Sequence, residues 1–261
     1  MTNNFINLKN RKNKKQQKTQ KRGHMNISGI IFDLDDTLYD CTGTVFARVV
    51  KHISTEIAPL LNCSPKKVFT TYQKILKQEP NVIKATHLVC KQLGAGKSAG
   101  AICSRAEKIY FLPALGITSI KLFPGVRTML LRLRKKYKLG LVTFGGYERQ
   151  NKKIDALKLR PLFHFIGVDQ YSTLELTKRE CFEDFLKKMN MAPADVICIG
   201  DKIADEIKIA NQLGMTTVRV LQGRYAKAKP ADDYEIPDYF VKKVTDAEKL
   251  IQRLSDKKVK A

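Results

Sequence analysis

Five short apolar runs, separated by segments of different character, constrain the fold of this chain most. They occupy residues 29–32, 139–142, 165–168, 196–199 and 217–220. Apolar runs of this length are typical of strands that are buried on both faces of a sheet. The segments between the last four runs have helical patterns, at residues 147–159, 178–191 and 203–213. Because strands that alternate with helices form parallel sheets, we expect an α/β fold, a Rossmann-like parallel sheet with helices on both faces.

A longer segment between the first two runs interrupts this alternation. It has four helical patterns, at residues 44–60, 65–78, 82–93 and 99–110. Ser64 followed by Pro65 is a helix start signal, because serine caps free amides and proline fits the first helical position. We therefore expect a helical domain at residues 44–119, inserted into an α/β core formed by residues 25–43 and 120–261.

Polar side chains follow three of the apolar runs. Asp33 and Asp35 follow the first run, and Thr143 follows the second. Asp201 follows the fourth run after one glycine. Ligands of parallel α/β sheets bind beyond the carboxyl ends of the strands, so we expect these residues at one site. Residues i and i+2 of an extended chain share a face, and two close carboxylates repel unless a cation or a shared proton intervenes. The pair Asp33 and Asp35 therefore indicates a chemical role.

The order and spacing of these residues resemble the haloacid dehalogenase superfamily of hydrolases, of the type with a helical cap inserted between the first and second motifs. The motifs are Asp33-Leu-Asp35-Asp-Thr37, Thr143, Lys178, and Gly200-Asp201-Lys-Ile-Ala-Asp205-Glu206. The similarity covers nearly the whole chain from Met25 onward. Phe144 and Arg179 depart from it, since members often have Asn and Pro there. The resemblance implies that the 44–119 domain is a cap that closes over the site and reads the substrate.

The resemblance also implies an activity, a Mg²⁺-dependent phosphatase that hydrolyses a small phosphate monoester. Asp33 would be the nucleophile that forms an aspartyl-phosphate. Asp35 would protonate the leaving alcohol as general acid and then deprotonate water as general base. Thr143 and Lys178 would bind the phosphoryl oxygens of the substrate.

A magnesium site follows from the same resemblance. Its protein ligands would be the Asp33 and Asp201 side chains and the Asp35 backbone carbonyl, since Mg²⁺ takes oxygen ligands and substrate phosphate. Asp205 or Glu206 would support the metal. The spacing from Asp201 does not decide which of these two acids has that role.

The net charge of +23 favours anionic partners. Residues 1–24 hold eight Lys or Arg and no acid, a composition typical of a disordered tail. Residues 44–122 carry twelve Lys or Arg against three Glu, or 12 − 3 = +9, which would attract a phosphorylated small molecule. Two alternatives stay open: a phosphomutase of the same superfamily, and a nucleic-acid-binding or regulatory protein on the same scaffold. The second has weaker support, because the sequence contains no known nucleic-acid motif.

Cysteine usage and hydropathy predict the cellular compartment. The six cysteines are scattered without a Cys-x-x-Cys pair, and the sequence has no secretory segment. No apolar run is long enough to cross a membrane. We therefore expect a reduced, cytoplasmic protein without a membrane partner, and the sequence specifies no oligomeric state.

Overall fold

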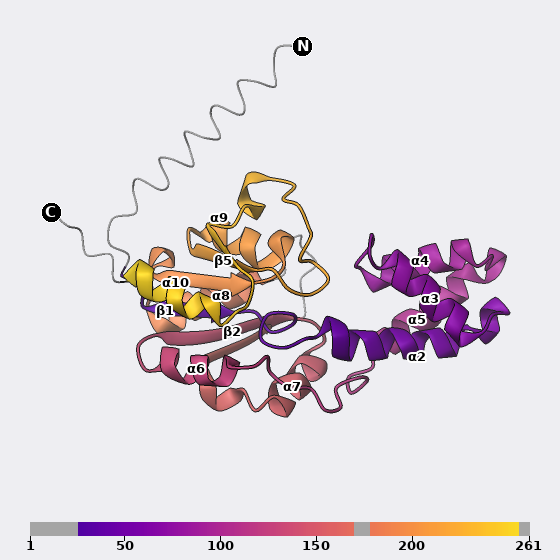
Figure 1. The fold of residues 1–261 in the computed structure, drawn as a ribbon, viewed down its shortest axis with the longest axis horizontal. Coiled ribbons are helices and arrows are strands. Elements are labelled where there is room, and N and C mark those ends of the chain that lie inside the picture. Colours follow the sequence, from indigo (N-terminus) through magenta and orange to yellow (C-terminus); the bar gives the residue numbers. More distant parts are fainter. Residues whose placement is uncertain (1–25, 170–177, 256–261) are drawn as a thin grey trace, which may run out of the picture.

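The computed structural model describes residues 26–169 and 178–255. It shows an α/β core with a group of helices projecting from one end (Figure 1). The basic tail expected at residues 1–24 lies outside the described residues. In the described part of the chain, no helix combines the length and apolar character that spanning a bilayer requires.

A six-stranded sheet forms the core, in the order β3-β2-β1-β4-β5-β6. Every neighbouring pair is parallel. The strands are β1 (Gly29–Phe32), β2 (Lys138–Phe144), β3 (Phe165–Asp169), β4 (Val196–Gly200), β5 (Thr216–Val220) and β6 (Tyr239–Val241). The expected α/β class and the five expected strands are confirmed. β6 was not predicted, because this short edge strand is only partly buried.

The strand order places β1 at the centre, between β2 and β4. The chain moves outward from β1 to β2 and β3, and then returns to the other side of β1 with β4. Ligands of parallel sheets bind at the carboxyl ends of the strands where the strand order reverses in this way.

Alternate strand residues contact helices on opposite faces of the sheet. Ile30 and Phe32 pack on the face covered by α6 (Val126–Arg134), α7 (Tyr147–Ala156) and α10 (Asp246–Ser255). Ile31 packs on the opposite face with α8 (Arg179–Met189) and α9 (Lys208–Leu213). Both faces of β1 are buried, which explains why its sequence is apolar without alternation.

The insertion between β1 and β2 is helical, as expected. It contains the π-helix η1 (Thr42–Phe46), α2 (Ala47–Ile57), α3 (Pro65–Ile75), α4 (Val82–Gln92) and α5 (Ala99–Tyr110). Ser64 caps α3 by accepting a hydrogen bond from the Lys67 amide at 3.3 Å. The helix expected at 44–60 is instead a π-helix, an α-helix and the 3₁₀ turn η2 (Pro59–Leu61). Figure 1 shows α2 running from the core to the far end of the insertion.

Candidate active site

Asp33 lies at the carboxyl end of β1, where the strand order reverses. Its side chain is buried, and its amide donates to the Ile199 carbonyl of β4 at 2.9 Å. The Thr37 hydroxyl donates to Oδ2 at 3.2 Å, and the Lys178 ammonium donates to Oδ1 at 2.5 Å. Because both carboxylate oxygens have a partner, the orientation of this side chain is fixed.

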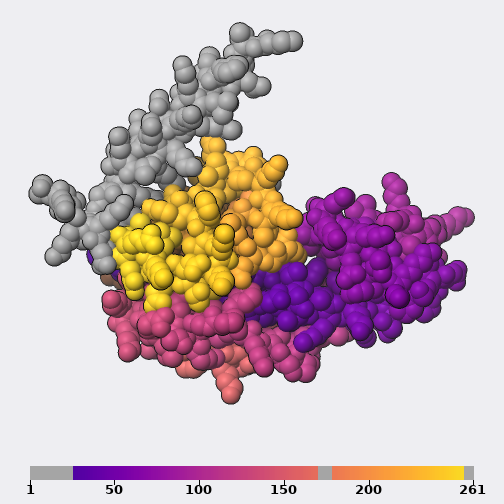
Figure 2. Space-filling view, viewed as in Figure 1, coloured from indigo at the N-terminus to yellow at the C-terminus, as the bar shows by residue number. Residues whose placement is uncertain are grey.

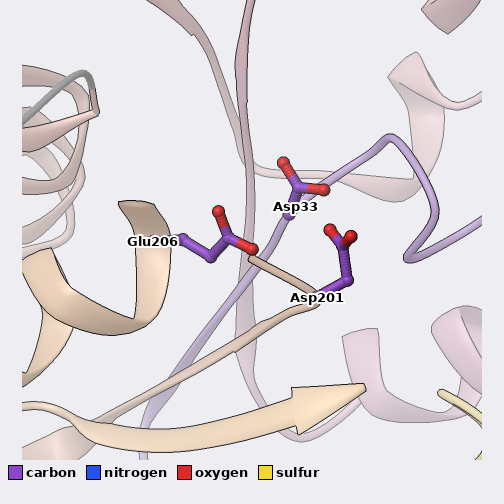
Figure 3. Close-up of side chains that lie close together, drawn as sticks. All are labelled: Asp33, Asp201 and Glu206. Atoms are coloured by element: carbon purple, nitrogen blue, oxygen red, sulfur yellow. The ribbon is translucent and has the colours of Figure 1, made fainter. Parts of the chain in front are cut away.

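Asp33, Asp201 and Glu206 form a cluster of three buried carboxylates (Figure 3). One oxygen from each lies within 4.8 Å of the other two. Asp33 follows β1, Asp201 follows β4, and Glu206 belongs to the π-helix η6 (Ile203–Ile207). This all-oxygen donor set fits a hard cation such as Mg²⁺.

The pKa values in the cluster show how strongly burial opposes its negative charge. Burial raises the pKa of Asp33 to about 7, although the Lys178 ammonium acts in the opposite direction. Burial raises the pKa of Asp201 well above its usual range, and the negative charges of Glu206 and Asp33 add to this shift. A bound cation would relieve both shifts by favouring the ionised carboxylates.

Lys178, the residue before α8, is the cation that the protein itself supplies to this cluster. Its ammonium lies 2.5 Å from Asp33, 3.0 Å from Glu206 and 3.7 Å from Asp205. The side chain is buried. The structure therefore brings the predicted lysine, at the start of α8, to the predicted aspartate at the end of β1.

The structure distinguishes the surroundings of Asp205 and Glu206, two acids between which the sequence did not choose a metal-supporting residue. Glu206 belongs to the carboxylate cluster, and its Oε1 accepts a hydrogen bond from the Lys202 amide at 2.6 Å. The Asp205 carboxylate lies 3.6 Å from the Lys202 ammonium and 3.7 Å from Lys178. Of the two acids, Glu206 is therefore the one that the described fold places beside Asp33 and Asp201.

Asp35 has partners of its own, outside the cluster. The Lys153 ammonium of α7 donates to its two oxygens at 2.9 and 2.7 Å, and the Tyr39 hydroxyl donates to Oδ1 at 2.6 Å. Burial alone would raise the pKa of Asp35, but Lys153 and Tyr39 outweigh it and lower the pKa to about 2. β1 ends at Phe32, before either aspartate, so the strand does not set the directions of the two side chains. Asp33 is held by Thr37 and Lys178. Asp35 is held by Lys153 and Tyr39.

Thr143 lies in β2 with its side chain buried. Its hydroxyl oxygen accepts a hydrogen bond from Gln150 Nε2 at 2.5 Å, and the same nitrogen donates to the Phe144 carbonyl at 3.0 Å. Because the Thr143 oxygen is held as an acceptor, its hydroxyl hydrogen is available to a further acceptor. The predicted phosphate-binding threonine therefore lies at the carboxyl edge of the sheet, oriented by α7.

Sequence reasoning missed three residues of this site, Tyr39, Gln150 and Lys153. The signal for the last two was weak, since α7 is a polar helix whose lysines would ordinarily be solvated. The spacing i and i+3 puts Gln150 and Lys153 on one helix face, and both are buried. The ion pair between Lys153 and Asp35 explains how a lysine is tolerated there.

We expect the protein without bound metal to become less stable as the pH rises from about 4 to 8. Asp33 and Asp201 both have raised folded-state pKa values, so the folded protein keeps protons that the unfolded chain has released. Stability from such groups is fully present below the unfolded pKa and is lost as the pH rises through the folded pKa. With a chelator present, Tm should be lower at pH ~8 than at pH ~5.5 by about 5 °C or more.

The substitution Asp33→Asn provides the control for this pH dependence. An amide at position 33 does not titrate, so the Tm difference between the two pH values should shrink in this variant. A wild-type Tm that is higher at pH ~8 than at pH ~5.5 without metal would contradict the assigned pKa directions.

Residues 30–220 match the family described as "Haloacid dehalogenase-like hydrolase". Among curated relatives, the glyceraldehyde 3-phosphate phosphatase of Methanocaldococcus jannaschii is 28% identical over 230 residues, which cover 87% of this chain and 98% of the relative. Human N-acylneuraminate-9-phosphatase is 24% identical over 251 residues, which cover 90% of this chain and 98% of the relative.

Solved structures show the same fold. The putative hydrolase YfnB from Bacillus subtilis, in a crystal form bound to magnesium, superposes with a TM-score of 0.58. It is 17% identical and covers 88% of this chain and 99% of its own chain. The likeness therefore includes both the sheet and the helical insertion.

Proposed function

This chain belongs to the haloacid dehalogenase-like hydrolases, and we propose that it is a phosphatase that hydrolyses a small phosphate monoester through Asp33. The observation that carries this proposal is the buried Asp33 carboxylate, held by Lys178 beside Asp201 and Glu206. The names of the curated relatives agree with it, since both are phosphatases of small phosphorylated metabolites. The test is a panel of phosphate monoesters, with and without Mg²⁺, in which released phosphate is measured.

The first chemical step is attack by an Asp33 oxygen on the substrate phosphorus. A bond forms between that oxygen and phosphorus, and the bond from phosphorus to the alcohol oxygen breaks. Lys178 and the Thr143 hydroxyl neutralise and orient the phosphoryl oxygens during transfer. Water then attacks the phosphorus of the aspartyl-phosphate, which releases inorganic phosphate and restores the Asp33 carboxylate.

Asp35 carries the protons of both steps in this proposal. Ionised and held by Lys153 and Tyr39, it is a base that can accept a proton from the attacking water. To protonate the leaving alcohol, Asp35 must first gain a proton. The negative charge of a bound phosphate raises the pKa of a neighbouring carboxyl group, so substrate binding favours the protonated form.

The cluster would hold Mg²⁺ through the Asp33 and Asp201 side chains and the Asp35 backbone carbonyl, with Glu206 and Asp205 supporting it. When bound, the ion supplies positive charge that neutralises the transferring phosphoryl group. Two ammonium groups, those of Lys178 and Lys202, lie among four acids, Asp33, Asp201, Asp205 and Glu206. The site therefore keeps a net negative charge that favours a divalent cation.

We expect Asp201→Asn to lower Mg²⁺ affinity by at least about 100-fold, because even residues that only orient a metal ligand change affinity by about 10- to 100-fold. A chelator should remove the activity of the wild type, and added Mg²⁺ should restore it. The measurement is phosphate release against Mg²⁺ concentration, paired with the Mg²⁺-dependent shift of Tm. Asp184→Asn, at an exposed position of α8, is the matched control. Equal Mg²⁺ dependence in Asp201→Asn and wild type would remove Asp201 from the metal site.

We propose that residues 44–119 act as the cap of this site. Support comes from the position of the insertion, which leaves the core directly after the Asp33 loop and returns before β2. Arg149 of α7 donates to the carbonyl oxygens of Tyr110 and Leu115, so the returning chain is tied to the helix that also carries Lys153. Closure of this unit would shield the transferring phosphoryl group from bulk solvent while leaving room for the one water that hydrolyses the aspartyl-phosphate.

Product analysis separates this function from its alternatives. A phosphomutase would yield an isomerised sugar phosphate, whereas a phosphatase yields free phosphate and alcohol. A nucleic-acid-binding protein would show salt-sensitive binding to DNA or RNA that weakens when residues 1–24 are deleted. The proposed function predicts free phosphate as the product and no change in its release upon that deletion.

A further inference from the structure

Arg224, on the loop after β5, has a guanidinium group without hydrogen-bond partners for two of its nitrogens. Its Nε and Nη1 atoms are buried and have no partner within the described ranges 26–169 and 178–255. The group lies 4.2 Å from the centre of the Phe46 ring and 5.2 Å from that of Tyr225. Ring contacts hold the cation without using its N–H groups. Buried donors without acceptors are unfavourable, which points to a ligand that supplies them.

The Arg224 loop lies beside the candidate active site. Gly223 packs so closely on Asp36 that an added Cβ would lie 2.4 Å from the aspartate Cβ, and its φ of +68° also suits glycine. The Arg224 charge acts electrostatically on both Asp35 and Asp36. Figure 2 shows the gold C-terminal part of the core against the base of the violet insertion. Phe46 belongs to η1, the first element of that insertion. Arg224 therefore connects the core to the start of the insertion.

The neighbouring Arg219 serves a different purpose. Its Nη2 donates to the Tyr225 carbonyl at 2.7 Å, and its Nη1 donates to the Ala228 carbonyl at 3.1 Å. Arg219 thus stabilises the backbone of this loop from β5. Arg219 uses both terminal nitrogens on this loop and leaves only its Nε without a partner among the described residues, whereas Arg224 leaves Nε and Nη1 for another acceptor.

We propose that Arg224 binds a second anionic group in the alcohol part of the substrate, so that the substrate is a phosphate monoester that also carries a carboxylate or a second phosphate. A guanidinium presents a planar fork of donors that matches either oxyanion. Its loop packs on Asp36 through Gly223, and its guanidinium contacts Phe46 at the start of the insertion, so we place it on the side of the site where Asp35 would protonate the leaving alcohol. This inference rests on the proposed phosphatase function.

The experiment compares kcat/KM within two matched probe pairs. The first pair is D-3-phosphoglycerate and sn-glycerol 1-phosphate, which share the arrangement at C2 and differ in that a carboxylate replaces a hydroxymethyl group. The second is fructose 1,6-bisphosphate and fructose 6-phosphate, which differ by a phosphate. The wild type should prefer the more anionic member of at least one pair by about 10-fold or more, since charge-assisted hydrogen bonds are the stronger ones. The preferred pair identifies the second group.

Three variants connect this preference to Arg224. Arg224→Gln should lower kcat/KM for the preferred anionic probe by about 10- to 100-fold more than for its partner. Arg224→Lys keeps the charge but not the fork, so it should give an intermediate preference. Lys227→Gln removes the same charge from an exposed position on this loop and should leave the preference unchanged.

Two outcomes would overturn the inference while the proposed function survives. One is a wild type that hydrolyses p-nitrophenyl phosphate but shows no preference in either pair, and the other is an Arg224→Gln variant that keeps the full preference. If Arg224→Gln does not fold, as judged by thermal unfolding, the inference is decided by the preference of Arg224→Lys and by the wild-type ratio of kcat/KM within each probe pair. Failure of the wild type to release phosphate from every probe, p-nitrophenyl phosphate included, would instead overturn the proposed function and this inference with it.

Discussion

Asp33→Asn is expected to abolish phosphate release from p-nitrophenyl phosphate in the presence of Mg²⁺, with a loss of at least about 10⁴-fold in kcat. An asparagine has nearly the same shape as aspartate, but its neutral amide is a poor nucleophile and a weaker metal ligand. The hydrogen bonds from Thr37 and Lys178 reach Asp33 at 3.2 and 2.5 Å, so the native carboxylate is already oriented for attack. Steady-state kinetics with saturating Mg²⁺ measures the loss.

The control for this variant is Asp184→Asn, the same chemical change at a largely exposed aspartate. It should retain wild-type kinetics. Asp33→Asn itself should stay folded, because Lys178 keeps Glu206 at 3.0 Å and Asp205 at 3.7 Å as partners, and burial already opposes the Asp33 charge. Retention of full activity in Asp33→Asn would show that another group attacks phosphorus.

Lys178→Met should reduce both stability and activity. The ammonium contacts Asp33, Asp205 and Glu206, and its removal leaves buried carboxylates without their cation. Loss of one partner from a buried ion pair costs about 3–5 kcal/mol of unfolding free energy. The same cation is proposed to neutralise the phosphoryl group, so kcat should fall by at least about 100-fold. Denaturant unfolding without metal and steady-state kinetics measure the two effects.

Mg²⁺ should restore part of the stability that Lys178→Met loses. A divalent cation bound to the carboxylate cluster replaces the missing positive charge and stabilises the folded state by mass action. Activity should not return with it, because Mg²⁺ does not supply the second cation that contacts the phosphoryl oxygens. Lys187→Met, at an exposed position of the same helix, is the matched control. Unchanged unfolding free energy in Lys178→Met would contradict the buried network.

The strands that carry the site were predictable because strands buried on both faces consist of continuous apolar runs. β1 and β4 are buried at every position, and a buried parallel strand has no polar face. β6 escaped prediction because it is a three-residue edge strand in which Phe240 is 70% exposed. An edge strand relies on pairing with β5 rather than on burial, so its sequence carries little signal.

The contacts around the site were less predictable than its position. Lys178 and Asp33 are far apart in sequence, and only the motif order indicated that they meet. The ion pair between Lys153 and Asp35 depends on which face of α7 turns toward the sheet, which a polar helix does not specify. Likewise, the π-helical turn η6 determines that Glu206 joins the carboxylate cluster. A sequence pattern that assumes a regular helix leaves Asp205 and Glu206 equivalent.

The most direct test of the account is to trap the phosphorylated enzyme and locate its phosphoryl group. Wild-type protein is mixed with Mg²⁺ and a phosphate monoester that it hydrolyses, quenched in acid during turnover and reduced with borohydride, which converts an aspartyl-phosphate to homoserine. Peptide mass spectrometry then identifies the modified residue. The proposed phosphoenzyme mechanism predicts modification at Asp33 in wild type and none in Asp33→Asn. A substrate that turns over without modification of Asp33, or with modification at another residue, would contradict it.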